Sequence, residues 1–286
     1  MENNVYCIYS GKYIPDSQSS LEHIVPLSLG GSDDFTIMVD RNLNSIAGSS
    51  IDGKISNDFL VKMNTIKKDY RGHSKKEPVL KIKKAKLEDS PVSVHFKKSG
   101  MEIYDPIKKR LVTESAKVQL EMKIDLYARI RFVSKVALAA GYFTYKDIFV
   151  KYADHDSLRK IAFSKGIADE HLSGIKFYDN LHSVKEEDKG LHLTLKNLIK
   201  SSGSSCVIFV LSNINIIAYV GVGGEYIGTV NFKANTKKFP NDKGYRLGRV
   251  LVCNNNQLVA DSFWHAIYQF NKVHRLVDID DSVLEF

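Results

Sequence analysis

The sequence has few cysteines and no long apolar run. Its 286 residues include three cysteines, Cys7, Cys206 and Cys253, which are odd in number and lie far apart. This spacing excludes a disulfide framework and fits reduced thiols in a cytoplasm. No stretch approaches the roughly 20 apolar residues of a membrane-spanning helix, and the first residues lack the basic start and apolar core of a signal peptide. We therefore expect a soluble, cytoplasmic protein without a membrane partner.

Positive charge is concentrated in one segment. Residues 62–86 contain ten lysines or arginines against Asp69 and Glu77, and this local excess of +8 equals the formal net charge of the whole chain. Such a run is typical of a nucleic-acid-binding surface, although a solvated lysine-rich face would have the same composition. The predicted contacts to nucleic acid are Lys67, Lys68, Arg71, Lys75, Lys76, Lys81, Lys83, Lys84 and Lys86.

The stretch from Leu21 to Ile55 contains residues that suggest a reaction. Glu22 and His23 place a carboxylate beside an imidazole, and Asn42 and Asn44 follow where a helix could begin. A histidine titrates near neutrality and can act as a general base, while oxygen ligands suit magnesium better than zinc. The pattern predicts a metal-assisted phosphodiesterase.

Three motifs in this stretch resemble the HNH endonuclease superfamily, in particular its bacterial branch. They are Glu-His-Ile-Val-Pro at 22–26, Leu-Gly-Gly at 29–31 and Asn-Ser-x-x-Gly-Ser-x-Ile-Asp at 44–52, and the resemblance covers residues 5–75. It implies a ββα-metal unit in which His23 deprotonates the attacking water. It also implies a bound Mg²⁺ or Mn²⁺ at the catalytic centre, with ligands or shell residues from Glu22, Asn44, Asn42, Asp40 and Asp52.

The sequence also departs from this family. Relatives hold a structural zinc with two Cys-x-x-Cys pairs, but here the corresponding positions read Cys7-Ile-Tyr-Ser10 and Asp40-Arg-Asn-Leu43. A structural zinc site needs about four ligands, so we expect no zinc. The loop Ser32–Thr36 also lacks the middle asparagine of the family name. We expect apolar packing to replace the metal, through Ile8, Ile14, Ile24, Val25, Ile37, Val39 and Ile46.

The remaining sequence predicts an α+β protein with four parts. These are the HNH unit at 1–75, a lysine-rich β-meander at 76–114, a helical region at 115–185 and a β-rich domain of unknown role at 186–286. Apolar spacing and turn residues predict the elements within them. Expected strands are 21–27, 36–40, 191–195, 206–211, 214–222 and 247–253; expected helices are 45–63, one that begins near Ser115 and ends at Gly141, 145–152, 156–163 and 261–270.

These features together predict magnesium-dependent cleavage of DNA in bacterial restriction, anti-phage defence or mobile-element biology. A homodimer would allow both strands to be cut. Two alternatives stay open. The chain could be a non-catalytic nucleic-acid-binding protein that keeps the fold, or it could cleave RNA, because a basic run does not distinguish the two polymers.

Overall fold

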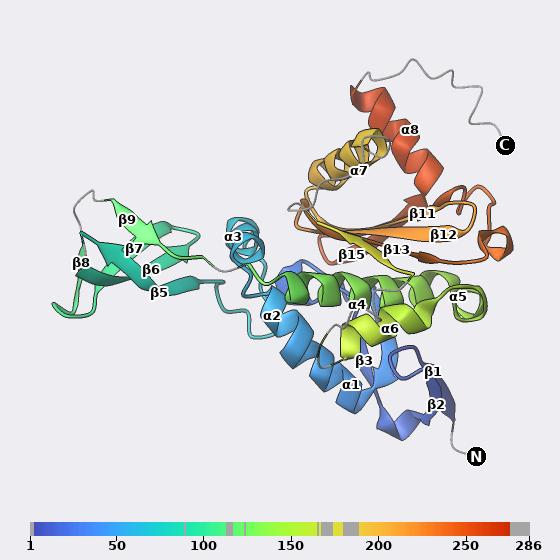
Figure 1. Cartoon of the computed structure of the whole chain (residues 1–286), viewed down its shortest axis with the longest axis horizontal. Helices are drawn as coiled ribbons and strands as arrows, with labels where there is room; N and C mark the ends of the chain where they lie inside the picture. The colour runs from blue at the N-terminus through green and yellow to red at the C-terminus, as the bar shows by residue number, and fades with distance from the viewer. Residues whose placement is uncertain are drawn as a thin grey trace.

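The computed structural model describes residues 3–88, 90–112, 117–122, 124–164, 166, 174–179 and 189–274. It contains helices and strands throughout, which confirms the α+β class (Figure 1). The predicted helix start near Ser115 lies outside these residues, but the helix predicted to continue from there was wrong, because Val118–Leu120 is a strand and the helix begins at Leu126. Within the described part of the chain, no helix has the length and apolar character needed to cross a membrane.

The N-terminal unit begins with two antiparallel hairpins. β1 (Asn4–Cys7) pairs with β2 (Lys12–Pro15), and β3 (Ser19–His23) pairs with β4 (Thr36–Asp40). The predicted strand at 21–27 was wrong at its end, because β3 stops at His23 and a 3₁₀ turn follows at Leu27–Leu29. Ile24 still donates its N–H to the Phe35 carbonyl at 3.0 Å, and Pro26, which has no N–H, cannot extend the ladder further.

The helix that follows β4 is broken into segments. α1 (Arg41–Ile46) continues into a π-helical stretch (Ala47–Asp52) and α2 (Gly53–Ile55), and α3 (Phe59–Lys68) comes after a break. The helix therefore starts four residues before the predicted Ser45. The carboxylates of Asp40 and Asp58 explain the two starts, since each accepts hydrogen bonds from the first backbone N–H groups of α1 or α3.

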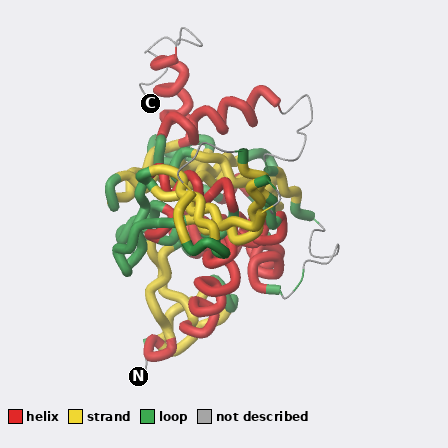
Figure 2. Tube along the Cα trace, turned by 90° about the vertical axis from the view of Figure 1, so that its left-hand side faces the viewer, coloured by secondary structure: helices red, strands yellow, loops and turns green. Residues whose placement is uncertain are grey.

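The lysine-rich segment at 76–114 forms the antiparallel strands that its alternating pattern predicts, and a fifth strand of the same sheet comes from the stretch predicted to be helical. The strand order is β8-β7-β6-β5-β9, and the sheet has a small core of its own around Val92 and Val94. It stands beside the rest of the molecule in Figure 1 and at the front of the view in Figure 2. The strands are β5 (Leu80–Leu87), β6 (Ser90–Lys97), β7 (Gly100–Asp105), β8 (Arg110–Val112) and β9 (Val118–Leu120).

The central helix α4 (Leu126–Tyr145) corrects the prediction of where this helix ends. It runs past Gly141, which does not end it; a Cβ there would lie 2.3 Å from a carbon of the Phe149 ring, so the glycine allows close packing. The charged side chains of Arg129 and Lys135 on this helix are 1% and 0% exposed. Both form buried ion pairs with the N-terminal unit.

Two shorter helices follow α4. α5 (Asp147–Tyr152) and α6 (His155–Phe163) agree with the predicted helices to within about two residues. Asp154 caps α6 by accepting a hydrogen bond from the Ser157 N–H.

The C-terminal part is a six-stranded sheet of order β10-β13-β12-β11-β14-β15 with helices on both faces. The predicted strand at 191–195 was wrong, because these residues lie in α7, where Leu195 and Ile199 face the sheet. Helices α7 and α8 cover one face and α4 the other (Figure 1). The elements are β10 (Lys176–Tyr178), α7 (Lys189–Ser202), β11 (Ser205–Leu211), β12 (Asn215–Val222), β13 (Glu225–Lys233), β14 (Gly248–Asn254), β15 (Gln257–Ser262) and α8 (Phe263–His274).

One hydrophobic cluster connects the N-terminal unit, α4 and the C-terminal sheet. It includes Ile8 and Ile24 from the first, Val136 from α4 and Phe209 from the sheet. Six of the seven predicted packing residues are buried, but Ile46 is 43% exposed. The shared core fixes the C-terminal sheet against the N-terminal unit, which matters for the site described next.

Candidate active site

His23 lies at the end of β3, beside the loop that leads to β4. Its Nε2 is 2.9 Å from Oδ1 of Asp33, a residue of that loop, and its side chain is 18% exposed. The ring of His73, from the segment after α3, lies 5.5 Å from the His23 ring between centroids. An ionised carboxylate only accepts hydrogen bonds, so this contact leaves Nδ1 of His23 as the nitrogen that can take a proton.

Asp33 is held in turn by Asn256 from the turn between β14 and β15. The Asn256 amide group donates to Oδ2 of Asp33 and accepts from the Asp33 N–H, at 2.9 and 3.1 Å. The hydrogen bonds from Asn256 and then from His23 lower the pKa of Asp33 below its usual value. Asp33 is therefore the ionised partner of His23 at neutral pH.

A cleft of about 850 Å³ opens beside this pair. One wall comes from the N-terminal unit and the segment after α3, and the other comes from Ser202–Ser204 and the β14–β15 turn. Its lining includes Asp33, His73, Lys68, Arg71 and Lys75. Three basic side chains next to a histidine–carboxylate pair make the cleft suitable for a phosphate group.

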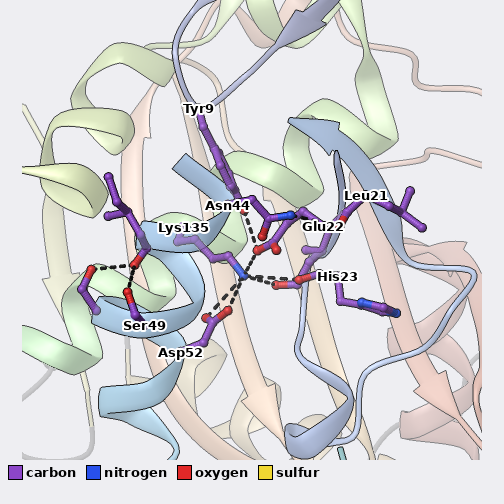
Figure 3. Close-up of polar contacts among 11 residues, drawn as sticks. Tyr9, Leu21, Glu22, His23, Asn44, Ser49, Asp52 and Lys135 are labelled. Atoms are coloured by element: carbon purple, nitrogen blue, oxygen red, sulfur yellow. Dashed lines mark hydrogen bonds and ion pairs between the residues drawn. The ribbon is translucent and has the colours of Figure 1, made fainter. Parts of the chain in front are cut away.

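Glu22 points to the opposite side of β3 from His23, into a buried cluster (Figure 3). Its Oε1 lies 2.5 Å from Nζ of Lys135 and accepts a hydrogen bond from the Tyr9 hydroxyl at 3.2 Å. Oδ2 of Asp52 lies 3.1 Å from the same ammonium group. Lys135 also donates to the backbone carbonyls of His23 and Ile24, both at 3.3 Å.

The cluster has two carboxylates and one ammonium, so it carries a net negative charge when all three are ionised. Burial raises the pKa of Asp52 to about 6, against the lowering effect of Lys135. Burial opposes the charge on Lys135, but the attraction of Asp52 and Glu22 raises its pKa above the ordinary value. Lys135 is therefore charged, and Asp52 takes up a proton in mildly acidic solution.

The predicted metal ligands do not converge on one open position. Lys135 holds Glu22 and Asp52, Asp40 caps α1, and the amide of Asn44 donates to the Ser20 hydroxyl and the Leu21 carbonyl. Asn42 is exposed on α1. In the described part of the chain, no group of three or more His, Cys, Asp or Glu side chains could hold a metal ion. As arranged, these donors do not fit a shared magnesium ion, and their roles as ligands stay predictions.

Three residues at the positions compared above with two Cys-x-x-Cys pairs, Cys7, Ser10 and Asp40, lie close together. The Sγ of buried Cys7 accepts hydrogen bonds from the backbone N–H groups of Asp40 at 3.2 Å and Ser10 at 3.4 Å. These contacts join the β1–β2 hairpin to the start of α1.

The predicted nucleic-acid contacts fall into two groups. Lys68, Arg71 and Lys75 line the cleft, with Lys67 and Lys76 exposed near them. The other four project from β5, on the five-stranded sheet, and are exposed: Lys81, Lys83, Lys84 and Lys86.

Sequence reasoning missed four residues of the site. The loop that contains Asp33 was considered only for its missing asparagine, and His73 was not among the predicted site residues. A signal for Lys135 was present, because a lysine inside the apolar run Val133–Leu138 has no route to solvent and needs a buried partner. Nothing in the sequence pointed to Asn256, which is 223 residues from Asp33.

Comparisons with known proteins returned no relative. No family model, no curated protein and no solved structure matches this chain.

Proposed function

We propose that this chain is an HNH-type endonuclease that hydrolyses DNA phosphodiester bonds with His23 as the general base. The observation that carries the proposal is the His23–Asp33 pair beside a basic cleft. Nδ1 of His23 takes a proton from water, and the hydroxide attacks phosphorus in line with the leaving 3′ oxygen. The bond from phosphorus to that oxygen breaks, and the 3′ oxygen takes a proton from solvent to become the 3′-hydroxyl. Asp33 stabilises the imidazolium that forms, while Lys68, Arg71 and Lys75 offset the charge of the phosphates. The family resemblance implies 5′-phosphate and 3′-hydroxyl products.

A second candidate is a nucleic-acid-binding protein without catalysis. The contact of Glu22 with Lys135 favours it, because an ammonium 2.5 Å from the carboxylate repels a second cation at that oxygen. Both candidates predict DNA binding that weakens with salt. Only the endonuclease predicts nicking.

The test is incubation of supercoiled plasmid with the protein in Mg²⁺, in Mn²⁺ and in chelator, beside an RNA substrate. We expect nicking of the plasmid, and we expect His23→Ala to slow it by about 10²–10⁴-fold with the fold and DNA affinity retained. The matched control is His95→Ala, because His95 is a histidine of β6 on the five-stranded sheet. Wild-type nicking by His23→Ala, in preparations free of contaminating nuclease, would refute the assignment. The chelator arm tests the predicted metal dependence separately.

A further inference from the structure

The C-terminal sheet reaches the candidate active site through one turn. Asn255 and Asn256 connect β14 to β15, and both have left-handed backbone angles, with φ of 49° and 62°. Two successive left-handed residues make a tight hairpin turn, and asparagine tolerates this conformation better than most residues. The turn therefore projects the Asn256 side chain in a fixed direction, towards the loop that carries Asp33.

We propose that Asn256 is a positioning residue that sets the orientation of His23 through Asp33, so that the C-terminal sheet completes the active site. The inference rests on the proposed function for its catalytic consequence, but its geometry is independent of it. Asn256 makes three hydrogen bonds to the loop. Its side-chain amide donates to Oδ2 of Asp33 and accepts from the Asp33 N–H, and its backbone carbonyl accepts from the Ser32 hydroxyl at 2.8 Å.

The two oxygens of Asp33 have separate partners. Oδ2 accepts from Asn256 and Oδ1 faces Nε2 of His23, so one carboxylate links the two residues. Burial does not hold this carboxylate, since 61% of the Asp33 side chain is exposed. Hydrogen bonds to the amide group of Asn256 therefore hold the rotamer of Asp33, and that rotamer selects the His23 tautomer with a proton on Nε2.

The position of the C-terminal sheet against the N-terminal unit does not depend on the hydrogen bonds of Asn256. Ser205 donates its hydroxyl proton to the Leu29 carbonyl, and Asn64 donates to the carbonyl of Val222 at 2.7 Å. The shared hydrophobic core adds to these contacts. A change at Asn256 should consequently leave the sheet in place and alter only the Asp33–His23 pair.

The experiment compares Asn256→Gly and Asn256→Asp with Asn255→Gly in the full chain. Glycine keeps the left-handed backbone and removes the amide, whereas aspartate keeps the acceptor for the Asp33 N–H but replaces the donor with a second carboxylate. Nitrogen-15 NMR of histidine-labelled protein above neutral pH reports the tautomer of His23, whose signals are identified by their loss in His23→Gln. Plasmid nicking rate and DNA affinity are measured on the same samples.

We expect the wild type and Asn255→Gly to hold the tautomer protonated on Nε2, and both Asn256 variants to show a mixture. Nicking should slow by about 10-fold or more with DNA affinity unchanged, because a catalytic group misplaced by 1 Å can cost about 100-fold. Asn256→Asp should be affected more than Asn256→Gly. An unchanged tautomer in both Asn256 variants would overturn the proposal, whatever the nicking rate. If the wild type does not nick, the proposed function fails, while the NMR result still decides the role of Asn256.

Discussion

Replacement of Lys135 by methionine should destabilise the protein strongly at pH 8. The ammonium is 0% exposed, and its partners Glu22 and Asp52 have side chains that are 7% and 10% exposed. Methionine fills a similar volume but leaves two carboxylates in a buried site without a counter-charge. Removal of one partner of a buried ion pair costs about 3–5 kcal/mol, which is a large part of the stability of a typical domain.

The loss should be smaller at pH 5. Burial already raises the pKa of Asp52 to about 6 in the presence of Lys135, and without the ammonium this pKa rises further. An acid with a raised pKa in the folded state binds a proton more tightly when folded than when unfolded. Stability of the variant therefore increases as the pH falls through that folded-state pKa towards the ordinary value.

Urea unfolding followed by circular dichroism at pH 8 and pH 5 measures both effects. Lys160→Met, at an exposed position of α6, serves as the control and should change stability by less than about 0.5 kcal/mol. The double variant Lys135→Met with Asp52→Asn should lose less than the single variant, since one of the two unpaired charges is gone. A loss below about 1 kcal/mol at pH 8, or an equal loss at the two pH values, would refute this account of the cluster.

Three further predictions follow from the site and its surroundings. Because the pKa of Asp52 is raised to about 6, the wild type should gain up to about 3 kcal/mol of stability as the pH falls from about 6 to about 4. Asp52→Asn should abolish this gain, and an unchanged pH profile of stability in the variant would contradict the raised pKa. Elemental analysis of protein purified without chelator should find no stoichiometric zinc, because Cys7 is the one thiolate left of the family set, and one zinc per chain would reverse the prediction. Neutralising the β5 lysines should weaken DNA binding and reduce the slope of log affinity against log salt by about 0.9 per lost phosphate contact. The β5 lysines to be replaced by glutamine are Lys81, Lys83, Lys84 and Lys86. The matched control replaces four other exposed lysines by glutamine: Lys151, Lys200, Lys237 and Lys238. If the two variants show the same salt slope, DNA does not bind along β5.

Elements with an unambiguous period could be predicted from the sequence. The strands β4, β11 and β12 follow from apolar alternation and turn residues, and their bounds agree to within about two residues. The alternation in 76–114 also predicts strands there, but β9 lies beyond that segment. The segment at 191–195 alternates as well, yet it is helical. Leu191 and Leu193 are 44% and 59% exposed, while Leu195 packs with Ile199 at helical spacing. These residues fit both the periodicity of a strand and that of a helix, and the packing of Leu195 and Ile199 against the sheet favours the helix.

The site could be predicted only where it is local. His23 was identified from its own motif, and Asp33 lies ten residues away in the same hairpin. The expected ligand role of Glu22 depends on what faces β3, and that partner is Lys135, more than 100 residues later in the chain. The packing of α4 against the N-terminal unit creates the contact between Glu22 and Lys135. A local sequence pattern contains no information about such a distant partner.

The N-terminal unit is supported from two sides by later parts of the chain. Behind β3, Lys135 binds the carbonyls of His23 and Ile24, so α4 fixes the backbone at the position where the proposed base begins. In front, Asn256 fixes the carboxylate that faces the same histidine. These contacts with α4 and the C-terminal sheet give the N-terminal unit rigidity around His23. Lys135 of α4 and Asn256 of the β14–β15 turn therefore hold the backbone and the carboxylate partner of the proposed base His23.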